Sequence, residues 1–92
     1  MSFTVIVSDD LKKKLTILKR RDHTTYVSLQ KKMLQIIACD RTTIEHFKNL
    51  RGHLSDFKRV HIGNSVLIFR VADETIFFEA FDHHDKIYKK IS

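Results

Sequence analysis

The hydrophobic patterns of the sequence predict an α+β fold in which a two-helix hairpin packs on one face of a small antiparallel sheet. Three observations lead to this prediction. A β-branched segment opens the chain, two segments with helical periodicity follow, and three segments typical of strands come after them. The expected order is β-α-α-β-β-β. We expect residues 1–92 to form a single domain, because a chain of this length has room for one core.

The first half of the chain predicts one strand and the helical hairpin. Residues 3–7 (FTVIV) are β-branched and aromatic, which favours a strand. Ser8 is placed to cap a first helix, whose leucines recur on one stripe with basic residues elsewhere. Asp22 and His23 interrupt this pattern. The two threonines before Tyr26 are placed to cap the second helix.

The second half predicts an antiparallel meander, after a loop with one helical turn. Residues 57–62 (FKRVHI) alternate, which places Arg59 and His61 on the sheet face away from the helices. Residues 66–71 are nearly all apolar, as in a central strand, and residues 75–81 form the third strand. Basic and imidazole groups on an uncovered sheet face indicate a surface that binds RNA or phosphate.

The charge and composition limit the class of protein. Seventeen Lys and Arg against eleven Asp and Glu give a net charge of +6, which favours a polyanionic or acidic partner over a merely solvated basic surface. Cys39 is the only cysteine, so a disulfide within the chain and a cysteine-based zinc site are excluded. No run approaches the roughly 20 apolar residues that a membrane span needs, and no secretory signal pattern is present. We therefore expect a cytoplasmic protein with no membrane contact.

The six histidines raise the possibility of a metal site, but the pattern favours it only weakly. There is no HExxH motif, and the adjacent His83 and His84 are expected to point in opposite directions on an extended strand. One of them can be combined with His61 and Asp85, yet the spacing does not demand it. We therefore expect no metal and no cofactor.

Acid–base chemistry fits the same residues better. RNA cleavage by the 2′-OH needs a base, an acid and cations near the phosphate, and imidazole exchanges protons near neutral pH. His61 and His84 can supply the first two. Basic residues that can supply the cations are Lys48, Lys58 and Arg59. His84 and Tyr88 are four residues apart and share a side, although this spacing fits a packing anchor equally well.

At this point the chain resembles the RelE/ParE superfamily of toxins from type II toxin–antitoxin systems, over nearly its whole length. From NLRGHL onward it is similar to the branch typified by YafQ. The shared elements are a Leu-x-Gly connector, an aromatic–basic pair, a His on the next strand, an apolar strand and a closing His-x-x-x-aromatic. Here they read Leu50-Arg51-Gly52, Phe57-Lys58, His61, VLIF and His84…Tyr88.

The resemblance implies a ribosome-dependent endoribonuclease that needs no metal and leaves a 2′,3′-cyclic phosphate on the mRNA. It implies that His61, His84 and Tyr88 are catalytic. Positions expected to contact RNA or phosphate are Lys48, Lys58, Arg59, Asn64, His83 and Lys86. The implied partners are a cognate antitoxin with an acidic or amphipathic segment, the ribosome and mRNA, with operator DNA bound only through the antitoxin.

Three departures from the branch keep two alternatives open. Lys48 stands where the branch has a His, the first hairpin is one residue shorter, and Val66 stands where RelE itself has an Arg. The first alternative is a catalytically degenerate RelE-fold protein that binds an antitoxin or nucleic acid. The second is a ParE-like gyrase inhibitor, which the placement of His61 and His84 argues against.

Overall fold

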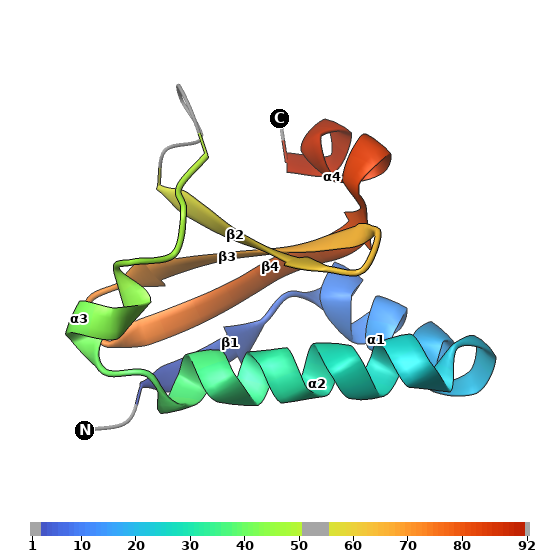
Figure 1. Ribbon diagram of the computed structural model, residues 1–92, viewed down its shortest axis with the longest axis horizontal. Coiled ribbons are helices and arrows are strands. Elements are labelled where there is room, and N and C mark those ends of the chain that lie inside the picture. Colours follow the sequence, from blue (N-terminus) through green and yellow to red (C-terminus); the bar gives the residue numbers. More distant parts are fainter. Residues whose placement is uncertain (1–2, 51–55, 92) are drawn as a thin grey trace.

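The computed structural model describes residues 3–50 and 56–91, of which residues 88–91 are described by their backbone alone (Figure 1). The elements in chain order are β1 (Thr4–Val7), α1 (Asp9–Arg21), α2 (His23–Ala38), α3 (Arg41–Ile44), β2 (Phe57–Ile62), β3 (Ser65–Ala72), β4 (Thr75–His83) and α4 (His84–Ile91). The predicted α+β fold and the order of its elements are confirmed. The closing helix α4 was not predicted.

The cap expected at Ser8 is present and ties α1 to the sheet. The Ser8 hydroxyl oxygen accepts a hydrogen bond from the backbone N–H of Leu11 at 3.1 Å. The same hydroxyl donates to the backbone carbonyl of Glu79 in β4 at 2.6 Å. One side chain therefore starts the helix and fixes it against a strand that lies far away in the sequence.

The second helix begins earlier than the sequence analysis expected. Asp22 ends α1 and caps α2, because its carboxylate accepts hydrogen bonds from the Thr25 backbone N–H at 3.2 Å and the Thr25 hydroxyl at 2.7 Å. The expectation that the threonines before Tyr26 cap this helix was therefore wrong. A carboxylate is the better acceptor at this position, and α2 starts at His23.

The sheet has the strand order β1-β4-β3-β2 and is mixed. Strands β2, β3 and β4 form the expected antiparallel meander, but β1 pairs with β4 in parallel. No tight turn joins β1 to β4, so this pairing is not restricted to the antiparallel direction. The register of β3 against β4 shifts between Ile68 and Phe69, where Glu79 is the extra residue of a bulge.

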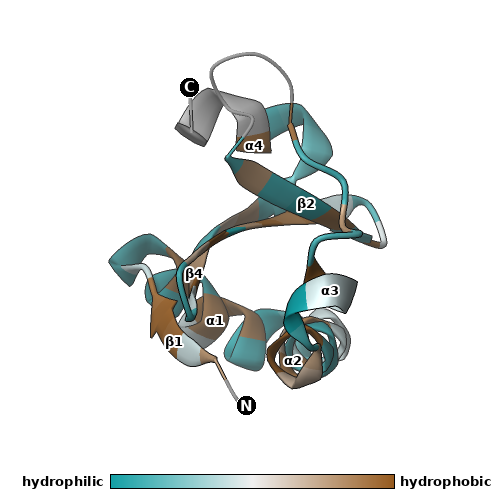
Figure 2. Cartoon of the chain, turned by 90° about the vertical axis from the view of Figure 1, so that its left-hand side faces the viewer, coloured by the Kyte–Doolittle hydropathy of each residue, from teal (hydrophilic) through white to brown (hydrophobic). Residues whose placement is uncertain are grey.

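Helices cover both faces of the sheet (Figures 1 and 2). Helices α1 and α2 pack on one face, where the larger cluster of buried side chains includes Leu29, Phe69 and Phe78. On the other face, Ile87 of α4 is fully buried and belongs to a second cluster that contains Leu50, Val66, Ile68 and Ala80. The expectation that this face is uncovered was therefore wrong at the end where α4 lies.

Ile87 is the described side chain that anchors α4, so we predict that Ile87→Ala lowers the free energy of unfolding by about 2–5 kcal/mol. The reason is the cavity that the shorter side chain leaves against Val66 and Ile68. Denaturant unfolding followed by circular dichroism measures the loss. Lys86→Ala is the matched control, since this neighbouring side chain is exposed and its removal should change stability by less than about 0.5 kcal/mol. An equally small effect of Ile87→Ala would contradict the anchoring.

The capping bonds of Asp22 predict a pH dependence of stability. The Thr25 hydroxyl, followed by the Thr25 backbone N–H, holds the pKa of Asp22 below its ordinary value. A carboxyl whose pKa is lower in the folded state stabilises the fold above about pH 4, and this contribution disappears as the pH falls. The thermal midpoint of Asp22→Asn should therefore fall less steeply than that of the wild type between about pH 5 and pH 2. Glu74→Gln serves as the control, and identical pH profiles for Asp22→Asn and the wild type would refute the prediction.

Candidate functional site

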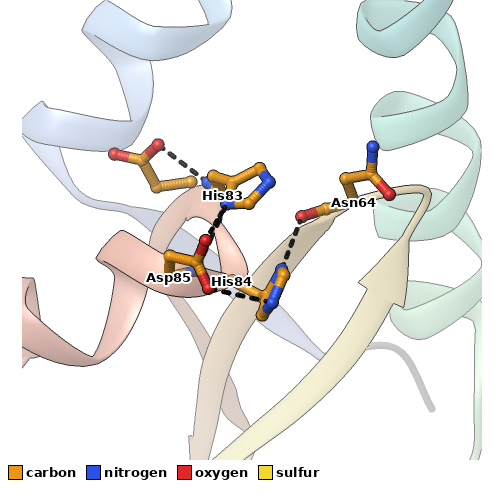
Figure 3. A network of polar contacts seen from close by, with 5 residues as sticks. Asn64, His83, His84 and Asp85 are labelled. Atoms are coloured by element: carbon orange, nitrogen blue, oxygen red, sulfur yellow. Dashed lines mark hydrogen bonds and ion pairs between the residues drawn. The ribbon is translucent and has the colours of Figure 1, made fainter.

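The junction between β4 and α4 is held in place by the turn between β2 and β3 (Figure 3). The backbone N–H of His84 donates to the backbone carbonyl of Asn64 at 3.1 Å. The His84 ring atom Nδ1 lies 3.4 Å from the same oxygen. A carbonyl oxygen only accepts, so this contact is a hydrogen bond when Nδ1 carries a proton. Asn64 thus positions His84 through its main chain.

The turn itself depends on Gly63. Its φ of +61° lies in the left-handed region, which residues with a side chain rarely adopt. Gly63 therefore lets the chain reverse between Ile62 and Ser65, which pair across the hairpin and bring the Asn64 carbonyl toward α4.

His83 and Asp85 complete a compact group with His84. The Nε2 atom of His84 lies 3.0 Å from one carboxylate oxygen of Asp85, and Nδ1 of His83 lies 3.5 Å from the other. The backbone N–H of Asp85 also donates to His83 Nδ1 at 3.3 Å, so His83 acts as the N-terminal cap of α4. Asp82 in turn accepts a hydrogen bond from the His83 backbone N–H at 2.8 Å.

The expectation that His83 and His84 point in opposite directions was wrong. Their ring centroids are 4.7 Å apart and the ring planes are tilted by 35°. Side chains alternate only while the chain is extended, and the strand ends at His83. The helical backbone that begins at His84 turns the second ring to the same side as the first.

His61 lies at the same end of the sheet but outside this group. It pairs with Val66 of β3, which in turn pairs with Asp82 of β4. Val66 belongs to the same buried cluster as Ile87, so direct cross-strand neighbours place His61 on the face that carries α4. The backbones of β2 and β4 are about 9–10 Å apart, since each pair of strands is separated by about 4.8 Å. This separation leaves room for a phosphodiester between His61 and His84.

A groove lies beside His61, where the connecting segment runs along the edge of β2. Its lining includes His46, Lys48 and Arg59, together with Phe47 and Val60. The backbone N–H of Arg59 donates to the Lys48 carbonyl at 3.0 Å, which holds the connecting segment against the strand. The structure thus brings Lys48, Arg59 and His61 together along this groove. Sequence reasoning did not single out His46, although its position two residues before Lys48 was a signal that could have found it.

The other candidate positions are placed differently. Lys58 lies on the helix-facing side of β2 with Val60, and its ammonium donates to the Asn49 side-chain oxygen at 2.7 Å and the Phe47 carbonyl at 3.4 Å. The structure therefore does not bring Lys58 together with His61. Lys86 is exposed on α4. Tyr88 belongs to α4, but its side chain lies outside the described residues, as do Arg51 and Gly52 of the connector.

Sequence comparison finds a close relative in an archaeon. The chain is 43% identical over 91 residues to a protein of Methanocaldococcus jannaschii named "Putative toxin RelE4", and the match covers 96% of this chain and 93% of that protein. A search of protein-family models found no match.

Solved structures share the fold at lower identity. The E. coli DinJ–YafQ toxin–antitoxin complex contains a chain with a TM-score of 0.74 at 18% identity, covering 96% of this chain and 99% of that one. E. coli toxin RelE, solved as a double mutant with a peptide of the antitoxin RelB, has a TM-score of 0.65 at 19% identity, with coverage of 100% and 96%. Within residues 3–50 and 56–91, no helix is long and apolar enough to cross a membrane.

The turn at Gly63 gives a test of how the site is held. An added Cβ meets nothing within 4 Å, so Gly63→Ala should cost only the backbone strain of the left-handed region, about 1–2 kcal/mol. Gly63→Asn should cost less, because Asn adopts this region more readily. Denaturant unfolding of both variants measures the difference. Equal stabilities of wild type and Gly63→Ala would show that the turn does not need this φ.

Proposed function

The chain belongs to the RelE family of toxins from toxin–antitoxin systems, and we propose that it is a ribosome-dependent endoribonuclease that inhibits translation. The observation that carries this proposal is the pair His61 and His84 on one face and at one end of the sheet. The net charge of +6 and the groove with Lys48 and Arg59 supply the cations that an RNA substrate requires.

The two histidines carry out the two proton transfers of the reaction. One imidazole takes the proton of a 2′-OH, and the 2′-oxygen attacks the adjacent phosphorus. The bond from phosphorus to the 5′-oxygen then breaks, and the other imidazole protonates that oxygen. The products are a 2′,3′-cyclic phosphate and a 5′-OH end, and the step needs no metal. Tyr88 completes the catalytic set by positioning the base or phosphate. Arg59 and Lys48 stabilise the charge that develops on the phosphate.

His84 exchanges protons through Nε2 in this scheme, because the Asn64 carbonyl holds the proton on Nδ1. The RNA displaces the carboxylate of Asp85 from Nε2. The Asp85 side chain is 72% exposed, so it can turn into solvent without breaking core contacts. Asn64, His83 and Lys86 then line the approach of the RNA backbone.

The proposed partners follow from the family and the surface. Solved relatives are complexes with the antitoxins DinJ and RelB, and we infer a cognate antitoxin for this chain. Exposed apolar side chains at Val5 and Ile6 on the edge strand β1, together with the positive charge, suit an amphipathic or acidic segment. Operator DNA would be contacted by the antitoxin and not by this chain directly. Because ribosomes and mRNA are in the cytoplasm, we infer that the activity is cytoplasmic.

We predict that His61→Ala and His84→Ala each reduce mRNA cleavage on ribosomes by about 10²–10⁴-fold, the usual contribution of one acid or base. Cleavage is measured by primer extension on programmed ribosomes, and the 3′ ends are tested for a 2′,3′-cyclic phosphate. His23→Ala is the matched control, because His23 is an exposed histidine on α2 away from this face. The double variant His84→Ala, Tyr88→Phe should also abolish growth arrest on expression.

Three outcomes would overturn parts of this proposal. Full cleavage by both single variants would reject the acid–base pair. A wild-type protein that binds ribosomes but leaves mRNA intact would indicate the degenerate alternative, which the buried Val66 at the position of an Arg in RelE favours. Intact mRNA together with DNA damage after induction would indicate a gyrase inhibitor instead.

A further inference from the structure

His83, His84 and Asp85 bring three potential metal ligands together at the start of α4 (Figure 3). One ligand atom from each residue lies within 4.8 Å of the other two. The contacts are 3.0 Å from His84 Nε2 and 3.5 Å from His83 Nδ1 to the Asp85 carboxylate. Ligand atoms around a tetrahedral ion with bonds of about 2.0–2.1 Å are about 3.3–3.5 Å apart. Small rotations of exposed side chains would therefore admit one ion.

Coordination requires each imidazole to offer the lone pair of one ring nitrogen to the ion. The Asn64 carbonyl favours a proton on Nδ1 of His84, and an ion would replace the proton through which Nε2 contacts the Asp85 carboxylate. A backbone carbonyl on the second nitrogen is the usual partner of a metal-bound histidine, because it fixes the tautomer and the ring orientation. His83 Nδ1 accepts the Asp85 backbone N–H, so it also carries a lone pair. Coordination exchanges this 3.3 Å hydrogen bond for a bond to the ion.

Some of the charges around His83, His84 and Asp85 oppose a bound cation, and others favour it. The helix N-terminus and the net charge of +6 oppose a cation. Asp85 in the first turn offsets them directly, and Asp82 adds a carboxylate beside the His83 backbone, where it also pairs with Lys14 at 3.6 Å. Two imidazoles and one carboxylate suit borderline transition metals, whereas Mg²⁺ and Ca²⁺ prefer oxygen ligands alone.

We propose that His83, His84 and Asp85 bind one divalent transition-metal ion of the zinc, nickel or copper class, with solvent completing the coordination. The ion is coordinated by Nε2 of His84, and this is the atom that exchanges protons in the proposed nuclease. On the premise of that function, the ion is an inhibitor that competes with the proton for one lone pair.

Isothermal titration calorimetry of the untagged chain with zinc chloride tests the site without RNA. The wild type should bind one ion. His83→Asn keeps a capping side chain and Asp85→Asn keeps the shape, yet each removes a ligand. Each should weaken binding by at least tenfold, since loss of an outer partner alone costs roughly 10–100-fold. His23→Ala should bind like the wild type, and circular dichroism verifies that every variant is folded.

Absence of binding at millimolar zinc, or unchanged affinity in both His83→Asn and Asp85→Asn, would overturn the proposal. A loss of binding in His23→Ala with retention in Asp85→Asn would place the ion elsewhere and overturn it as well. In the cleavage assay, zinc should inhibit the wild type at concentrations at least tenfold below those needed for Asp85→Asn, each relative to its own zinc-free rate. A wild type without zinc-free cleavage would reject the nuclease and leave the calorimetric result standing.

Discussion

The change from strand to helix between His83 and His84 is the constraint on which the candidate site depends. The Asn64 carbonyl holds the first residue of α4 through both its backbone and its ring, and Ile87 is fully buried three residues later. The helix is therefore fixed at the β2–β3 turn and on the sheet. These two contacts bring two imidazoles and a carboxylate close together on the surface. The three side chains come from a strand end and a helix start, not from a long loop.

The sheet face under α4 both stabilises the helix by apolar packing and carries residues of the candidate site. Val66, Ile68 and Ala80 give it an apolar strip that receives Ile87, while Arg59 and His61 on the neighbouring β2 give it a polar edge. An arginine at position 66 would have to place its charge beneath α4, so the apolar residue there explains how this chain retains the helix. The groove is then formed by β2 and the connector that carries Lys48.

Local patterns predicted those parts of the fold that local forces determine. The alternation over 57–62 gave the bounds of β2, and the hydroxyl of Ser8 caps α1 as expected. Helix α4 was missed because eight residues are too few to form a stable helix alone, and its stability comes from the burial of Ile87 and the contact with Asn64. The shared direction of the two imidazoles was missed for the same reason. The candidate residues could be proposed from the sequence, but their grouping depends on tertiary contacts.

The two proposed uses of His84 make opposite demands on Asp85. Both need a proton on Nδ1, which a hydrogen bond to the Asn64 carbonyl stabilises, and both use Nε2. Proton transfer to RNA requires the carboxylate to leave Nε2, whereas an ion requires it to stay beside His83 and His84. A carboxylate that is 72% exposed can do either at little cost. Under these two proposals, the position of the Asp85 carboxylate is therefore what distinguishes proton transfer from metal binding.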